Sequence, residues 1–203
     1  TAGFSVATFT TSGGGIDTVG HSLGVAPSMI ILKSTTNVNN WSIYHKSLGN
    51  NKEILFTTGA SSTNTIWNNT TPTSTVWSLN TANFGTGRGA VAYCFANTSM
   101  IKCGSYTGNG STDGTFVYTG MKPAFILVKN TQTGVNSWEI HDNKRDTYNV
   151  GTKRLYPNAS ASEGSGTYVD MLSNGFKWRS TDGGHNSAHT FIYLAIAENP
   201  LVT

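Results

Sequence analysis

One stretch of the sequence occurs twice, and this repeat most constrains the fold. Between Val25 and His45 a proline leads into four apolar residues, a polar turn follows, and the stretch closes on Trp-Ser-Ile-Tyr-His. From Met121 to Asp142 the same order of proline, apolar run, turn and tryptophan returns. The prolines differ by 123 − 27 = 96 positions and the tryptophans by 138 − 41 = 97. Because a duplicated unit tolerates a slip of one residue in a turn, we expect two related halves, residues 1–98 and 99–203.

The segments between the turns have the periodicity of β-strands. Residues Gly3 to Thr10 alternate apolar with small or polar side chains, as a half-buried strand does. The runs Met29–Leu32 and Phe125–Val128 are apolar on both faces, so each is expected to be a central strand. In Trp41-Ser42-Ile43 and Trp138-Glu139-Ile140, the Trp and Ile are expected on one side and the middle residue on the other.

Later in the two halves, small insertions increase the offset between matching strands. Val76-Trp77-Ser78 aligns with Phe176-Lys177-Trp178 at an offset of 176 − 76 = 100, and each half closes on a long apolar strand, 90–96 or 190–197. No stretch predicts a helix longer than a turn, because good helix formers are scarce. The sequence therefore predicts an all-β protein, an antiparallel jelly-roll-like β-sandwich built from two tandem sequence-related halves within a single domain, residues 1–203.

The composition is poor in charge. Charged residues make up 11% of the chain, compared with roughly 25% in ordinary soluble domains. The net charge is +3, and the basic residues are scattered. We interpret the densest basic group as a solvated loop: Lys144, Arg145, Lys153 and Arg154. Without a basic stripe interleaved with aromatic residues, nucleic-acid binding is not expected. No apolar run approaches the ~20 residues that cross a bilayer, so membrane insertion is not expected either.

The two cysteines, Cys94 and Cys103, are expected as thiols rather than as a disulfide. Cys94 lies in an apolar run whose counterpart in the second half is Ala195, which favours a small buried side chain. A disulfide between the two strands is the alternative. Neither cysteine has the paired spacing of a zinc site, and the sequence predicts no metal and no other cofactor.

Histidines and carboxylates form no recognisable catalytic pattern. We interpret the histidines as surface or strand-end residues: His21, His45, His141, His185 and His189. Glycoside hydrolysis needs two carboxylates that converge from different elements. The candidates lie in the second half: Glu139, Asp142, Asp146, Glu163, Asp170 and Asp182. Their spacing selects no pair, so no catalytic residue is predicted, and Asp142 and Asp146 around Arg145 equally indicate a local ion-pair cluster.

The tryptophans are the other candidates for binding, because an aromatic ring can stack on the apolar face of a sugar while amides and carboxylates bind its hydroxyls. Trp41 and Trp138 are repeated, which favours a role in the core. Trp67 lies in an Asn-rich segment with Asn68 and Asn69 and has no counterpart in the second half. We therefore select Trp67 as the tryptophan to test for exposure, with packing in the core or at an edge as the alternative.

Five motifs together carry a family resemblance. They are GHSLGVAP at 20–27, WSIYHKSLG at 41–49, AYCFA at 92–96, GSYTGNG at 104–110 and LSNGFK at 172–177. As a set they resemble a repeat-containing β-domain of tail-fibre-type and virion appendage proteins of tailed bacteriophages. The resemblance covers essentially the whole chain. It implies a β-domain made in the bacterial cytoplasm and displayed on the virion surface in several copies, where it contacts the host cell envelope.

The functional prediction is a non-enzymatic appendage domain that binds a host-surface glycan or another envelope component. A structural virion module, for fibre assembly or capsid decoration, is the first alternative, and a polysaccharide depolymerase is the second. The expected partners are a host cell-surface glycan or protein, other virion proteins, and further copies of the chain in a trimer. The candidate ligand-binding residues are Trp67, Asn68, Asn69, His141, Asp142, Asp182 and His185. They come from the regions where the halves differ most: the Trp67 loop, His141 to Tyr148, and Ser180 to Ser187.

Overall fold

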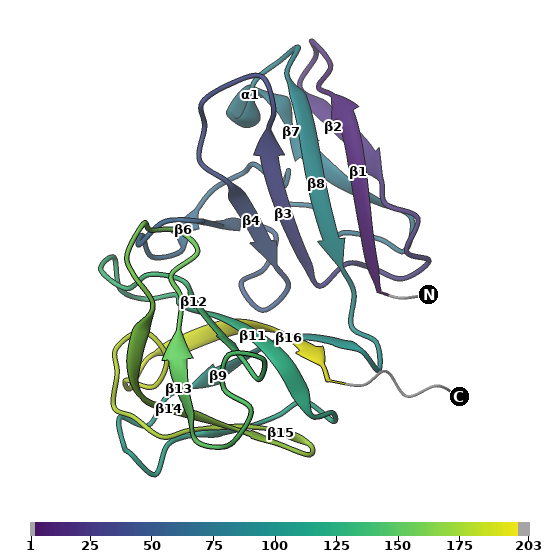
Figure 1. The fold of residues 1–203 in the computed structure, drawn as a ribbon. Helices are drawn as coiled ribbons and strands as arrows, with labels where there is room; N and C mark the ends of the chain where they lie inside the picture. The colour runs from purple at the N-terminus through teal and green to yellow at the C-terminus, as the bar shows by residue number, and fades with distance from the viewer. Residues whose placement is uncertain (1–2, 199–203) are drawn as a thin grey trace. The chain divides into compact units, whose positions relative to one another are not determined.

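The computed structural model describes residues 3–198 and confirms an all-β, antiparallel fold (Figure 1). The first half contains β1 (Phe4–Thr10), β2 (Ile16–Gly20), β3 (Met29–Ser34), β4 (Ser42–His45), β5 (Lys52–Leu55), β6 (Ser62–Thr63), β7 (Val76–Asn80), α1 (Thr81–Phe84) and β8 (Gly89–Phe95). The second half contains β9 (Ile101–Thr107), β10 (Phe116–Tyr118), β11 (Pro123–Asn130), β12 (Glu139–Asp142), β13 (Gly151–Arg154), β14 (Gly164–Leu172), β15 (Gly175–Trp178) and β16 (Thr190–Ala197). Within residues 3–198, no helix is long and apolar enough to cross a membrane.

The chain divides into two compact units. Unit 1 consists of Thr1–Phe56 and Ser61–Asn97, and unit 2 of Thr57–Ala60 and Thr98–Thr203. Within the single domain that the sequence predicts over residues 1–203, the described residues form two hydrophobic clusters, one in each unit. The reason lies in the strand pairing, because the first strand of each half pairs with the last strand of the same half, β1 with β8 and β9 with β16. Each unit therefore closes on itself.

The two units share an order of strands. In unit 1 one sheet has the order β1-β8-β3-β4-β5-β6, and β2 pairs with β7. In unit 2 one sheet has the order β9-β16-β11-β12, and the other has the order β10-β15-β14-β13. The strands predicted to be central, β3 and β11, each lie between two neighbours. The units differ at β5, which extends the first sheet of unit 1, whereas β13 joins the second sheet of unit 2.

Each core fills the space between two sheets. In unit 1, Ile30 and Leu32 of β3 pack in one cluster with Trp77 and Leu79 of β7. In unit 2 the corresponding cluster combines β11 and β16 with β10, β14 and β15, and Trp178, Phe176 and Phe191 are its largest fully buried side chains. Burial of such apolar side chains from both inner faces is what stabilises a β-sandwich.

A repeated lysine fixes the same turn in both units. The Lys33 ammonium donates to the Asn39 carbonyl oxygen, and the Lys129 ammonium donates to the Asn136 carbonyl oxygen at 2.6 Å. The two acceptors are 136 − 39 = 97 positions apart, like the tryptophans that follow them. Lys129 is buried and also donates to the Thr58 carbonyl oxygen at 3.0 Å. The repeated motif is therefore a strand and turn held together by a side chain.

The structure corrects two expectations about tryptophans. Trp67 is 1% exposed and packs edge-on against Tyr44 and Trp77, with ring centroids 5.7 and 5.9 Å away, so it offers no stacking surface to a sugar. Trp41 was expected in the core but is 38% exposed and stacks on Tyr93 at 6.3 Å. Its counterpart Trp138 is buried as expected.

The cysteines agree with the sequence prediction. Cys94 and Cys103 are buried thiols and form no disulfide. They lie in different units, on β8 and β9. Burial raises the pKa of the Cys94 thiol to about 12, so this side chain behaves as a small apolar residue of the core of unit 1.

Candidate functional site

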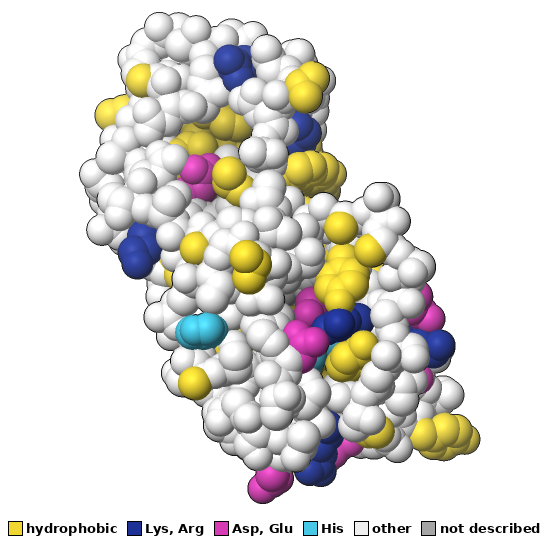
Figure 2. Space-filling model, turned by 90° about the vertical axis from the view of Figure 1, so that its left-hand side faces the viewer, with side chains coloured by type: hydrophobic (Ala, Val, Ile, Leu, Met, Phe, Trp, Pro, Cys, Tyr) yellow, Lys and Arg dark blue, Asp and Glu magenta, His cyan; other side chains and the backbone are white. Residues whose placement is uncertain are grey.

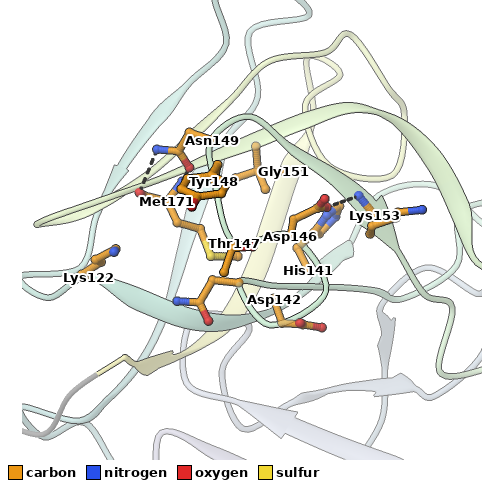
Figure 3. A pocket seen from close by; sticks show the side chains of 12 residues that line it. Lys122, His141, Asp142, Asp146, Thr147, Tyr148, Asn149, Gly151, Lys153 and Met171 are labelled. Atoms are coloured by element: carbon orange, nitrogen blue, oxygen red, sulfur yellow. Dashed lines mark hydrogen bonds between the residues drawn. The ribbon is translucent and has the colours of Figure 1, made fainter.

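Unit 2 contains a polar pocket at the loop that joins β12 to β13. The pocket has a volume of about 160 Å³. Its lining includes His141 and Asp142 at the end of β12, and Asn143, Asp146, Tyr148 and Asn149 of this loop. Figure 3 shows most of these side chains, and Val169 and Met171 of β14 are also part of the wall. The end of β12 and the loop after it thus present imidazole, carboxylate, amide and phenol groups together.

Hydrogen bonds hold the loop in shape. Asp142 binds Arg145 through its side chain at 2.7 Å, as the predicted ion-pair cluster requires. Asp146 instead accepts backbone N–H groups of Thr152 and Lys153, at 2.6 and 2.5 Å. Asn149 exchanges two hydrogen bonds with the Met171 backbone, at 3.1 and 2.9 Å. Figure 3 draws the bonds of Asn149 and Asp146. The pocket is therefore largely formed before a ligand arrives.

One side chain at the pocket is open to solvent, and two buried atoms there lack hydrogen-bond partners. The Tyr148 side chain is 86% exposed. Within the described residues, the buried atoms Nδ1 of His141 and Oδ1 of Asn143 have no hydrogen-bond partner. A buried polar atom without a partner costs about 1–3 kcal/mol. A ligand that supplied a hydrogen-bonding group to these atoms would remove that cost, and its binding would be stronger by a corresponding amount.

A buried cluster adjoins the pocket through His141. One oxygen of Glu139, Oε2, lies 2.7 Å from Nδ1 of His185 and 3.3 Å from Nε2 of His141. Its other oxygen, Oε1, accepts from Arg154 at 3.1 Å, and Arg154 also binds Asp182 at 2.8 Å. The exposed side-chain fractions of Glu139, His141 and His185 are 2%, 1% and 0%. The five side chains form one continuous polar network.

Local structure explains how the cluster assembles. Glu139 and His141 alternate along β12, so both point to the same face. His185 lies in a tight loop in which the Asp182 carbonyl oxygen accepts from the N–H groups of His185, Asn186 and Ser187. Gly184 allows this loop to approach, because a Cβ atom there would lie 2.0 Å from Oε1 of Glu139. Any larger residue at position 184 would collide with the carboxylate.

The environment lowers the pKa values of both Glu139 and His141. Burial opposes ionisation of Glu139, but hydrogen bonds from His141 and His185 outweigh it and hold the pKa of the carboxyl well below its usual range. Burial also lowers the pKa of His141, against the opposing effect of Glu139. At neutral pH the network is therefore built on an ionised Glu139 and a neutral His141.

Charged side chains of unit 2 are mostly paired with one another. Arg145 also binds Glu163 at 2.8 Å, Lys153 lies 3.4 Å from Glu163, and Lys122 lies 2.7 Å from Glu198. Figure 2 shows one face of the molecule, on which uncharged surface dominates and acidic and basic side chains lie close together in the lower part of the view. This arrangement gives short-range polarity at the pocket rather than a field of one sign.

The comparison with protein families gives one match. A family model described as a domain of unknown function, DUF7483, matches residues 1–200. The chain belongs to this family. The match spans residues of both units. No curated protein and no solved structure matches the sequence.

The DUF7483 fold brings together four of the seven predicted site residues. His141 and Asp142 line the pocket, and Asp182 and His185 belong to the adjoining cluster. Trp67, Asn68 and Asn69 lie in unit 1 instead, where the two asparagines have φ angles of 52° and 47° and shape a turn. These three residues do not join the pocket.

Four histidines are buried rather than at the surface, although His45 is the last residue of β4, as a strand-end position requires. The buried ones are His21, His45, His141 and His185. Arg154 was interpreted as part of a solvated loop, yet it lies on β13 with 16% of its side chain exposed and binds Glu139. Sequence reasoning did not select Glu139 or Arg154 as site residues. The pattern Glu-x-His, which places two ionisable groups on one strand face, was the available signal.

The cluster predicts acid sensitivity. Unfolded histidine and glutamate side chains titrate near ~6.5 and ~4.3. Because the folded pKa values of His141 and Glu139 lie lower, the unfolded chain takes up protons first as the pH falls, and stability is lost. We expect the free energy of unfolding to decrease below pH ~6.5 and more steeply below ~4.3. Urea unfolding at a series of pH values measures this dependence. In the variant His141→Gln, the decrease between pH ~6.5 and ~4.3 should become smaller. A pH-independent stability in the wild type would contradict it.

The same cluster contains the donors of a candidate metal site. One ligand atom each from Glu139, His141 and His185 lies within 4.8 Å of the others. Nitrogen and carboxylate donors of this kind suit borderline divalent cations. The sequence predicted no metal, because these residues are 2 and 44 positions apart and resemble no paired motif.

Proposed function

We propose that the chain is a non-enzymatic virion appendage domain that binds a host-surface glycan in the polar pocket of unit 2. The observation that carries the proposal is the combination, in one pocket, of the exposed Tyr148 ring with two buried polar atoms that lack partners, on His141 and Asn143. The resemblance to tail-fibre-type proteins supplies the biological setting.

The chemistry of the pocket fits a sugar. An exposed aromatic ring offers a flat apolar surface for the C–H face of a pyranose. The Asn143 amide oxygen and the His141 ring nitrogen offer hydrogen-bonding positions for hydroxyl groups. The volume of about 160 Å³ is smaller than the ~300–1,000 Å³ of pockets for drug-sized ligands. The pocket therefore suits one residue at the end or on a branch of a polysaccharide.

The comparison between the units supports the same location. In unit 1 the equivalent loop, between β4 and β5, covers residues 46–51, whereas the loop between β12 and β13 covers residues 143–150. The loop of unit 2 is thus two residues longer, 8 against 6. Loops on a common scaffold are where binding sites usually differ. The elongated loop is the part of unit 2 that carries Asp146 and Tyr148.

A pair of tyrosine variants tests the proposal. We expect Tyr148→Ala to weaken binding to a glycan selected on an array of bacterial surface polysaccharides by about tenfold or more, equivalent to about 1.4 kcal/mol. Its melting temperature should stay unchanged, because the side chain is 86% exposed. Tyr118→Ala is the matched control, since Tyr118 is 68% exposed and lies on β10 outside the pocket lining.

Three results would contradict the proposal. Absence of binding by the folded wild-type chain, both on the array and to host cells, would favour a structural virion module. Equal loss of binding in the Tyr148 and Tyr118 variants would place the contact outside the pocket. Shortening of the polysaccharide during incubation would instead indicate a depolymerase.

A further inference from the structure

We propose that Glu139, His141 and His185 form a binding site for a borderline divalent cation, with Zn²⁺ as the best-fitting ion. The proposal stands on the geometry of the buried cluster and does not depend on glycan binding. All three donor residues lie in unit 2.

The donor set matches this class of ion. Two imidazole nitrogens and one carboxylate oxygen are the protein ligands of several zinc sites that keep one position open, with the ion ~2.0–2.2 Å from each donor. Donor atoms of a tetrahedral site are consequently about 3.3 Å apart. Here Oε2 of Glu139 lies 3.3 Å from Nε2 of His141 and 2.7 Å from Nδ1 of His185. A small outward rotation of His185 would give room for the ion.

The donors are held by further residues, as metal ligands usually are. Ser180 Oγ lies 2.6 Å from Nε2 of His185, so the ring nitrogen that faces Glu139 is Nδ1. Arg154 binds only the oxygen of Glu139 that faces away from the histidines, Oε1. The charge of Arg154 is balanced by Asp182, 2.8 Å away. Counting Glu139 and Asp182 as negative and Arg154 as positive leaves these side chains with one net negative charge, which favours a cation. The buried Lys129 ammonium, which interacts electrostatically with Glu139, offsets part of this charge.

The pocket borders the site at His141. His141 belongs both to the cluster and to the pocket lining, so the pocket approaches the buried donors from the side of His141. Three protein donors leave one tetrahedral position, which a water molecule or another oxygen ligand takes in such sites. Hard cations such as Ca²⁺ prefer six to eight oxygen donors and fit this set poorly.

The competing account is a network of hydrogen bonds alone, in which protons on the two rings fill the space between the donors. Metal titration separates the two accounts. The full chain is first treated with a chelator, and Zn²⁺ is then titrated by calorimetry, with Ca²⁺ as the negative control. Co²⁺ serves as a coloured substitute whose visible absorption reports nitrogen ligands in a four-coordinate site.

We expect saturable binding of one Zn²⁺ per chain, an intense visible spectrum with Co²⁺, and no response to Ca²⁺. His185→Gln should abolish binding, whereas His189→Gln, four positions along the same segment, should leave it unchanged. Ser180→Ala removes only the outer partner of His185 and should weaken binding by about 10–100-fold. If His185→Gln does not fold, the Ser180 variant and the Co²⁺ spectrum decide. Absence of Zn²⁺ binding, or binding equal in all variants, would overturn the proposal.

Discussion

Replacing Glu139 by alanine is expected to lower the free energy of unfolding by about 3–5 kcal/mol, the usual cost of removing one partner from a buried ion pair. The carboxylate is 2% exposed and contacts His141, His185 and Arg154. Its removal leaves the Arg154 charge paired only with Asp182 and deprives two buried imidazoles of their acceptor. Urea unfolding of chelator-treated protein at pH 7 measures the effect without a contribution from bound metal.

The matched control is Glu163→Ala. Glu163 also pairs with an arginine, at 2.8 Å from Arg145, but it is a surface carboxylate. Surface ion pairs contribute little to stability, so its unfolding midpoint should stay close to that of the wild type. An equal, small effect of both substitutions would mean that the cluster around Glu139 does not stabilise unit 2.

Trp67→Ala is the second substitution with a large expected effect, a loss of about 3–5 kcal/mol, as for other buried aromatic residues. Trp67 is 1% exposed and fills the core of unit 1 between Tyr44 and Trp77. The cavity left behind is bordered by rigid rings, which collapse poorly around it. Thermal and urea unfolding measure the loss.

Trp41→Ala provides the comparison for Trp67. Trp41 is 38% exposed and stacks on Tyr93, so its removal should cost clearly less stability than that of Trp67. The reverse order of the two losses would contradict the placement of both tryptophans. Glycan binding should survive in any Trp67 variant that still folds, because Trp67 lies in unit 1 and the proposed pocket in unit 2.

The strands were predictable because their signals are local. Pro27 and Pro123 precede apolar runs, and these runs became β3 and β11 at the centre of their sheets. Apolar periodicity and turn residues report directly on strand positions. The predicted residue-by-residue alignment of the two halves was less accurate. The offset of 100 places Trp77 opposite Lys177, whereas burial and pairing place Phe176 in the equivalent core position. A slip of one residue exchanges the two faces of a strand.

The site was predictable only in part, because its partners are distant in sequence. On β12 the apolar residue Ile140 is half-buried, while the polar residues Glu139 and His141 face inward. Pattern reasoning assigns the apolar face to the core. Here the inward face is polar, since Arg154 and His185, 15 and 46 positions from Glu139, arrive to satisfy it. Disagreement between the halves nevertheless pointed to the loop after His141 and to the segment around His185.

Trp67 shows why a composition signal can mislead. Its neighbours Asn68 and Asn69 indicated a polar, exposed segment, and both do form a turn at positive φ. The turn directs the indole inward, however, where it completes an aromatic cluster with Trp77. Exposure of one residue does not follow from that of the next when the backbone reverses direction between them.

Amide chemical-shift mapping tests the central claim most directly. The ¹⁵N-labelled chain is titrated with the glycan that binds most strongly on the array. We expect the largest saturable shifts in the loop between β12 and β13 and at Met171, whose backbone is bound by the Asn149 side chain. Shifts confined to unit 1, or no saturable shifts in any amide, would contradict the assignment of the glycan site to this pocket.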